Sequence, residues 1–150
     1  MPYFQKGFII TLAKVNKLLQ RACAAAVSEY RFTPNEVEVL LFLMNNPAHD
    51  TATEIAQYRN VSKALVAKSV ESLCRRGFLT AGRDPRDRRV VHLPLSGQRS
   101  GIARRLQACE DALFARIEQG IPPACLDAAG QAFPILRENI DGLLKEFEER

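Results

Sequence analysis

Apolar residues recur at alternating spacings of three and four positions near both ends of the chain. Within residues 6–28 this stripe contains Ile9, Leu12, Asn16, Leu19, Cys23 and Ala26. Towards residue 149 a second stripe contains Leu126, Ala129, Phe133, Leu136, Ile140, Leu143 and Phe147. The spacing predicts two long amphipathic helices, the second with a seam like that of a coiled coil. Pro134 lies inside this second stretch and predicts a kink or a break there.

Between these stretches, helix start and stop signals predict a central helix. The segment Thr33-Pro34-Asn35-Glu36 places threonine at the cap, proline in the first turn and a glutamate that can reach back to the cap. Residues 37–44 are apolar almost all round, so we expect this helix in the middle of the core. The segment Asn45-Asn46-Pro47 ends it.

Two shorter helices joined by a tight turn are predicted to follow. The segment Thr51-Ala52-Thr53-Glu54 repeats the capping pattern and opens a helix to about Arg59. Asn60 tolerates the left-handed backbone that a tight turn requires. Ser62 is a suitable cap for a helix that ends at Arg76. This arrangement is typical of a helix-turn-helix.

A β-hairpin and another long helix are expected next. Residues 78–83 and 90–95 have the pattern of short strands, and the polar segment 84–89 between them is rich in turn formers. Ser96 is expected to cap a helix that extends to about Gln119. A hairpin directly after a helix-turn-helix is the layout of a winged helix.

The predicted elements define a fold class that is mainly α-helical with a small β-hairpin wing. Neither a long linker nor a repeat interrupts the sequence, so we expect a single domain over residues 1–150. Its parts are a winged helix-turn-helix over about residues 33–95 and long flanking helices over about residues 6–28 and 97–149.

The charge of the chain is concentrated in one segment. The whole chain carries a formal charge of +4, whereas residues 59–89 contain nine basic and three acidic residues, a net charge of +6. The rest of the chain is therefore slightly acidic. A concentrated basic segment on a winged-helix pattern indicates a polyanionic partner, and double-stranded DNA fits best. A solvated surface is the alternative interpretation.

The helix predicted over residues 62–76 has two distinct faces. At 100° per residue, Val66, Val70 and Leu73 fall on one side and are expected to face the core. The opposite face is small or cationic towards its N-terminal end, which suits entry into the DNA major groove. The residues predicted to contact DNA from this helix are Ser62, Lys63, Ala64, Ala67, Lys68, Arg75 and Arg76.

The predicted hairpin tip has a chemistry of its own. Arg86, Arg88 and Arg89 can place guanidinium groups in the narrow, negative minor groove. Asp84 and Asp87 are interpreted as carboxylates that hold neighbouring arginines and shape the loop. The alternative is a surface salt-bridge cluster that contacts no partner.

On these residues the sequence resembles the MarR family of bacterial transcription regulators. The most specific match is Asp84-Pro85-Arg86-Asp87-Arg88-Arg89, which is similar to the D-x-R-D-x-R pattern of the family wing. The Thr33-Pro34 helix start and the segment Leu73 to Gly77 also have counterparts in the family. Ala64 and Ala67 stand where the family commonly has hydroxyl residues, which affects the preferred base sequence.

The resemblance implies a homodimer that binds a palindromic site on double-stranded DNA. In this family the first and last helices of two chains intertwine, and a small aromatic or lipophilic effector often releases a repressor from DNA. The dimer interface implied here contains Ile9, Leu12, Leu136, Ile140, Leu143 and Phe147. The sequence does not identify the effector or its residues.

Several other functions find little support in the sequence. The longest apolar run, residues 39–44, is too short to cross a membrane. The four cysteines are scattered and form no C-x-x-C pair, which favours the cytoplasm. The sequence contains no nucleotide-binding loop and no H-E-x-x-H motif, and it indicates no pair of residues that could act as nucleophile and base. We therefore expect neither an enzyme nor a metal or other cofactor. The alternatives that stay open are a thiol-based redox sensor through Cys23, a zinc-responsive regulator, and a winged helix that binds protein.

Overall fold

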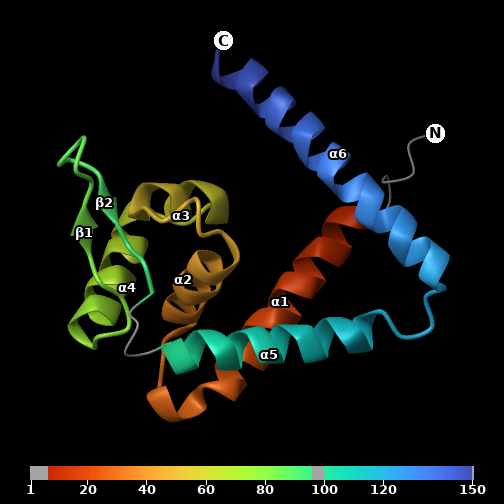
Figure 1. Cartoon of the computed structure of the whole chain (residues 1–150), viewed down its shortest axis with the longest axis horizontal. Helices are drawn as coiled ribbons and strands as arrows, with labels where there is room; N and C mark the ends of the chain where they lie inside the picture. The colour runs from red at the N-terminus through yellow and green to blue at the C-terminus, as the bar shows by residue number, and fades with distance from the viewer. Residues whose placement is uncertain (1–6, 96–99, 150) are drawn as a thin grey trace. The chain divides into compact units, whose positions relative to one another are not determined.

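The computed structural model describes residues 7–95 and 100–149, and helices dominate these ranges (Figure 1). The chain divides into two units, residues 1–113 and 114–150. Its elements are α1 (Phe8–Ala26), the 3₁₀ helix η1 (Ser28–Tyr30), α2 (Pro34–Asn45), α3 (Ala52–Arg59), α4 (Lys63–Arg75), β1 (Gly82–Arg83), β2 (Val91–His92), α5 (Ser100–Ile117) and α6 (Pro123–Glu148). The predicted fold class is confirmed, whereas the predicted Ser96 cap of α5 lies outside the described residues.

Both predicted capping boxes are present, and they fix where α2 and α3 begin. The Thr33 hydroxyl accepts from the Glu36 amide at 3.2 Å, and the Glu36 carboxylate accepts from the Thr33 amide at 2.9 Å. At α3 the same reciprocal pair joins Thr51 and Glu54. Each box satisfies amide donors that a helix N-terminus otherwise leaves unpaired.

The turn between α3 and α4 follows the sequence prediction. Asn60 adopts a left-handed backbone with φ of 52°, and the Ser62 hydroxyl accepts from the Leu65 amide at 3.3 Å. These two features stop α3 and start α4 within a few residues. The orientation of α4 also matches the expected one, because Val66 and Leu73 are buried.

The core of the first unit is centred on α2, as the nearly continuous apolar pattern of that helix predicts. Leu40 of α2 and Leu73 of α4 are among the fully buried side chains. The other α-helices of this unit each add buried residues, including Cys23 of α1, Ile55 of α3 and Leu106 of α5. This packing holds the helix-turn-helix against α2 and so positions the outer face of α4.

The β-hairpin is shorter than the predicted strands 78–83 and 90–95. Its antiparallel ladder contains only Gly82–Arg83 and Val91–His92, and Leu79 and Leu95 form an isolated bridge below it. The physical reason lies at the base of the hairpin. Phe78 and Leu79 are consecutive and both buried, which breaks strand alternation, and Pro94 has no amide to donate to the ladder.

Of the kink or break predicted at Pro134, the break is absent. α6 is one continuous element from Pro123 to Glu148, with Pro134 inside it. Proline removes one backbone donor, but the helical turns on either side keep their own hydrogen bonds.

Both α1 and α6 leave apolar side chains exposed. Ile9 is 72% exposed and Leu12 48% on α1, and Leu143 is 55% exposed on α6. Apolar stripes of this size are unfavourable in water and typically mark a surface for another chain.

Candidate nucleic-acid interface

The outer face of α4 presents most of the side chains that the sequence assigned to DNA contact. Lys63 and Lys68 are exposed, and Arg75 is exposed near the C-terminal end of the helix. The small or hydroxyl residues that share this surface are Ser62, Ala64 and Ala67. Small side chains between cations leave the helix slim enough for a DNA groove.

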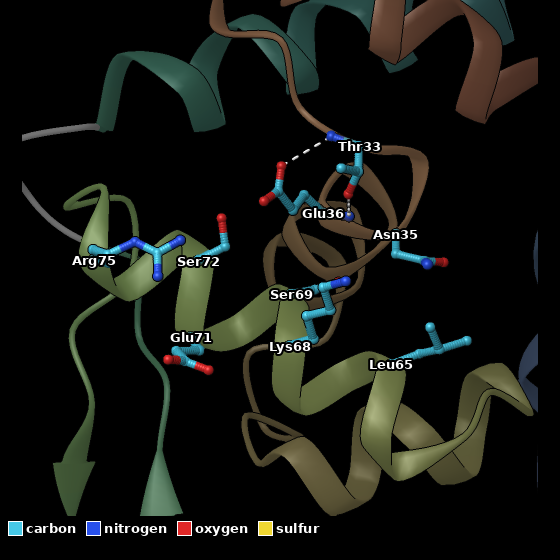
Figure 2. Close-up of a pocket in the computed structure, with 9 residues that line it drawn as sticks. All are labelled: Thr33, Asn35, Glu36, Leu65, Lys68, Ser69, Glu71, Ser72 and Arg75. Carbon is cyan, nitrogen blue, oxygen red and sulfur yellow. Dashed lines mark hydrogen bonds between the residues drawn. The ribbon is translucent and has the colours of Figure 1, made fainter.

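A groove of about 390 Å³ lies between this helix and the start of α2 (Figure 2). Lys68 and Arg75 supply its positive charge, and Glu71 and Glu36 its negative charge. Its lining residues are Thr33, Asn35, Glu36, Leu65, Lys68, Ser69, Glu71, Ser72 and Arg75. Sequence reasoning missed the part that α2 contributes. The capping box located the start of α2 but gave no signal that it lies beside α4.

Arg76 differs from the other arginines of this segment because its guanidinium is used inside the chain. It donates to the backbone carbonyl of Tyr30 and lies 3.5 Å from the buried Glu36 carboxylate. It also lies over the rings of Phe32 and Phe78, at 4.8 and 5.3 Å. The structure therefore gives Arg76, which the sequence assigned to DNA contact, a role in packing α4 against α2.

The loop at the tip of the hairpin is shaped by Asp84. One oxygen of this carboxylate accepts from the amides of Arg86 at 2.7 Å and Asp87 at 3.1 Å. The other oxygen lies 2.8 Å from Nε2 of His92. These hydrogen bonds hold the pKa of Asp84 below its ordinary value, the His92 imidazole being the largest cause.

The three arginines of the tip are placed differently. Asp87 accepts from Nε of Arg89 at 3.1 Å, and this contact lowers the pKa of the Asp87 carboxyl. The Arg86 and Arg88 side chains are exposed, and within the described residues their guanidinium groups form no ion pair. The wing thus presents two uncommitted cations on a loop that Asp84 holds in shape.

A smaller cavity of about 130 Å³ lies among α1, α2, α3 and α5. Arg59 lines this cavity. Its guanidinium forms an ion pair with Glu38 and donates a hydrogen bond to the Asn16 side chain at 3.1 Å. Nε of Arg59 is buried and has no hydrogen-bond partner among the described residues. On another wall, the Asn45 amide donates to Glu110, a buried carboxylate, at 2.9 Å. The sequence gave one signal for this site, the polar Asn16 within the apolar stripe of α1.

The cysteine of the redox hypothesis is fully buried. Cys23 of α1 lies against Cys109 of α5, and burial, with a smaller contribution from Cys109, raises the pKa of Cys23 to about 12. The thiolate is the form that reacts with oxidants, so a thiol that stays protonated reacts slowly. The geometry therefore does not favour Cys23 as a peroxide sensor.

The described residues provide neither a candidate metal site nor a candidate membrane span. Among the described residues, side chains of His, Cys, Asp and Glu form no group of three or more that could hold a metal ion. Within those ranges, none of the helices combines the length and apolarity that crossing a bilayer requires.

The helix-turn-helix, the hairpin and their cationic surface together define a winged helix-turn-helix protein. The model of the MarR family matches residues 32–90 of the chain. Transcriptional regulator AdcR of Streptococcus pneumoniae serotype 2 (strain D39) is 33% identical to it over 76 residues. That match covers 51% of this chain and 51% of AdcR, so the chain aligns with about half the length of this relative.

Solved structures extend the likeness over most of the chain. A MarR transcriptional regulator from Methanosarcina mazei Go1 superposes with a TM-score of 0.73 at 14% identity, covering 93% of this chain and 99% of the other. CouR from Rhodococcus jostii RHA1, crystallised with p-coumaroyl-CoA, gives 0.63 at 20% identity, covering 85% and 87%. At these identities the likeness concerns the fold.

Proposed function

We propose that this chain is a sequence-specific DNA-binding transcription regulator, a repressor that acts as a homodimer on a palindromic site. The observation that carries this proposal is the joint exposure of Lys63 and Lys68 on α4 and of Arg86 and Arg88 on the wing. A helix with small and cationic side chains can read the major groove. A hairpin with free guanidinium groups suits the adjacent minor groove or the phosphates.

The exposed apolar stripes of α1 and α6 support the proposed dimerisation. A second copy would cover these stripes and place two α4 helices about 34 Å apart, one turn of duplex DNA. The palindrome of the site would then mirror the twofold symmetry of the protein. The interface residues proposed here are those that the sequence indicated: Ile9, Leu12, Leu136, Ile140, Leu143 and Phe147.

Selection from a random duplex library tests the proposal. We expect the purified chain to enrich a palindrome whose half-sites lie about one helical turn apart. Affinity for the enriched duplex should fall steeply with salt, with log K decreasing by about 0.9 per neutralised phosphate for each unit of log salt concentration. A library that shows no enrichment would contradict DNA recognition and would favour the alternative of a protein-binding winged helix.

The small cavity beside Arg59 favours a second element of the function, release by a small effector. CouR, a structural neighbour, was crystallised with p-coumaroyl-CoA. The cavity here, at about 130 Å³, is close to the roughly 150 Å³ that holds benzene in an engineered protein core. Leu41 and Phe42 form an apolar part of the cavity wall. The charged residues of the lining are two acidic ones, Glu38 and Glu110, and one basic one, Arg59. We therefore propose a single-ring effector that is neutral or cationic.

Binding of such an effector is expected to raise the Tm of the protein and to lower its affinity for DNA. Thermal unfolding with neutral, cationic and anionic single-ring phenols measures the first effect. Leu19→Trp should fill the cavity and abolish the shift, whereas Leu18→Trp, at an exposed position of the same helix, should keep it. A shift with anionic phenols alone would contradict the proposed charge preference.

A further inference from the structure

His92 links the wing to the segment that precedes α3. Its Nδ1 lies 2.5 Å from a carboxylate oxygen of Asp50, and its Nε2 lies 2.8 Å from a carboxylate oxygen of Asp84. Asp50 precedes Thr51, the cap of α3, and its carbonyl also accepts from the Leu93 amide at 2.9 Å. The imidazole therefore connects the hairpin to the first helix of the helix-turn-helix.

Both ring nitrogens of His92 face acceptors, and this fixes what protonation does. A neutral imidazole has one N–H and can donate to only one of the two carboxylates, whereas an imidazolium has two N–H groups and can donate to both. Asp50, from the connection between α2 and α3, and Asp84, from the hairpin, are the titratable groups that face the ring from the elements packed against it. Only the protonated ring satisfies this arrangement on both sides.

The loop that carries the DNA-binding arginines depends on the same carboxylate. While one oxygen of Asp84 contacts His92, the other caps the amides of Arg86 and Asp87. Loss of the ring proton removes one of the two links of His92. Either Asp84 is then freed from the ring, or the ring is freed from the Asp50 carboxylate while the Leu93 amide stays bound to the Asp50 carbonyl. The carboxylate that caps the Arg86 amide loses its fixed partner in the first case and its connection through the ring to Asp50 in the second.

We propose that His92 is a positioning residue that sets the wing for DNA binding when protonated, so that affinity for DNA declines as the ring loses its proton. The proposal rests on the DNA-binding function proposed above. His92 acts through Asp84 and the wing loop in this scheme and does not itself need to touch DNA.

The direction of the pH effect follows from the two carboxylates. Hydrogen bonds to Asp50 and then to Asp84 raise the pKa of His92 above its ordinary value of 6.5. Because the pKa of His92 is raised in the folded state, the stabilisation that the imidazolium gives the folded protein is complete below pH 6.5. This stabilisation is lost as the pH rises through the higher pKa of the folded state. The window therefore lies on the alkaline side of 6.5.

The chain has only two histidines, His49 and His92, which makes the first measurement direct. Proton NMR of the two imidazole Hε1 signals over a pH series gives each pKa without DNA. We expect His92 to titrate above 6.5 and its pKa to fall in both Asp50→Asn and Asp84→Asn. A wild-type value at or below 6.5, or one that neither substitution lowers, would overturn the proposal.

The second measurement is DNA affinity over the same pH series at constant ionic strength, with the duplex enriched by library selection. Wild-type affinity should fall by about three- to tenfold from about pH 6 to about pH 9. His92→Gln should flatten this profile, because its amide cannot gain a second charge-assisted donor. His49→Gln is the matched control, since His49 contacts Glu54 at the start of α3, and should keep the full pH step.

The outcomes separate the possible failures. A His92→Gln protein that retains the wild-type pH step contradicts positioning by His92. A step that survives in Asp50→Asn and Asp84→Asn with an ordinary His92 pKa indicates direct contact of the ring with DNA and also contradicts it. Absence of DNA binding at every pH, with the NMR titration intact, contradicts the proposed function and leaves the link between the wing and α3 in place.

Discussion

Replacing both Arg86 and Arg88 with alanine is expected to weaken binding to all duplex sequences alike, by about 10- to 100-fold at moderate salt. Both side chains are exposed on the loop that Asp84 caps, and their guanidinium groups are uncommitted within the described residues. A dimer would lose four cations, so the slope of log K against log salt concentration should become shallower by up to about 3.6. Fluorescence anisotropy over a salt series measures both quantities.

The matched control for this variant removes the same charge elsewhere. Arg104 and Arg116 are exposed on α5, so their double replacement with alanine changes the net charge equally without touching the wing. We expect this control to keep most of the affinity and of the salt slope. Equal loss in both double variants would show that net charge, and not the wing, governs binding.

The segment from Arg59 to Arg89 shows how far a charge pattern predicts a binding surface. Seven of its nine basic residues, all but Arg59 and Arg83, were assigned to DNA contact from the sequence. In the structure, Arg59 pairs with Glu38, Arg76 with Glu36, and Arg83 donates to a backbone carbonyl of the wing. The cations left for a partner are therefore concentrated at two places, the outer face of α4 and the wing tip. The surface that can bind a partner is therefore smaller and better defined than the net charge of the segment suggests.

Local features of the fold could be predicted because their causes are local. The two capping boxes, the left-handed Asn60 and the Ser62 cap each depend on residues within a few positions. The orientation of α4 followed from the period of its apolar residues. In these cases the two residues that interact lie close together in the sequence.

The features that the sequence could not reveal join residues far apart in the chain. The contact of Arg76 with Tyr30 spans 46 positions, and that of His92 with Asp50 spans 42. Helical periodicity places a side chain on a face of its own helix but does not state which other segment covers that face. The pairing of Cys23 with Cys109 and the groove beside Thr33 were missed for the same reason.

The effect expected from disrupting the dimer is larger still, because each wing and each α4 would reach only half of a palindromic site. Leu143→Glu places a charge on the exposed apolar stripe of α6, where Leu143 is 55% exposed and Ile140 44%. Burying an unpaired carboxylate against a second copy is strongly unfavourable, so the variant should be monomeric at micromolar concentrations. Loss of the second half-site should then reduce affinity for the palindrome by about 100-fold or more.

Sedimentation velocity and DNA titration of the same samples provide the measurement. Gln131→Glu is the matched control, because it adds the same charge to α6 on the side opposite Ile140 at 100° per residue. We expect this control to dimerise and to bind the palindrome as the wild type does. Circular dichroism keeps the test independent of folding, since a helical Leu143→Glu monomer differs from an unfolded one. At a twofold interface the introduced carboxylate of one chain would lie near the same carboxylate of the second chain, and the two would repel each other. A Leu143→Glu protein that stays dimeric and binds with wild-type affinity would therefore show that the interface lies elsewhere.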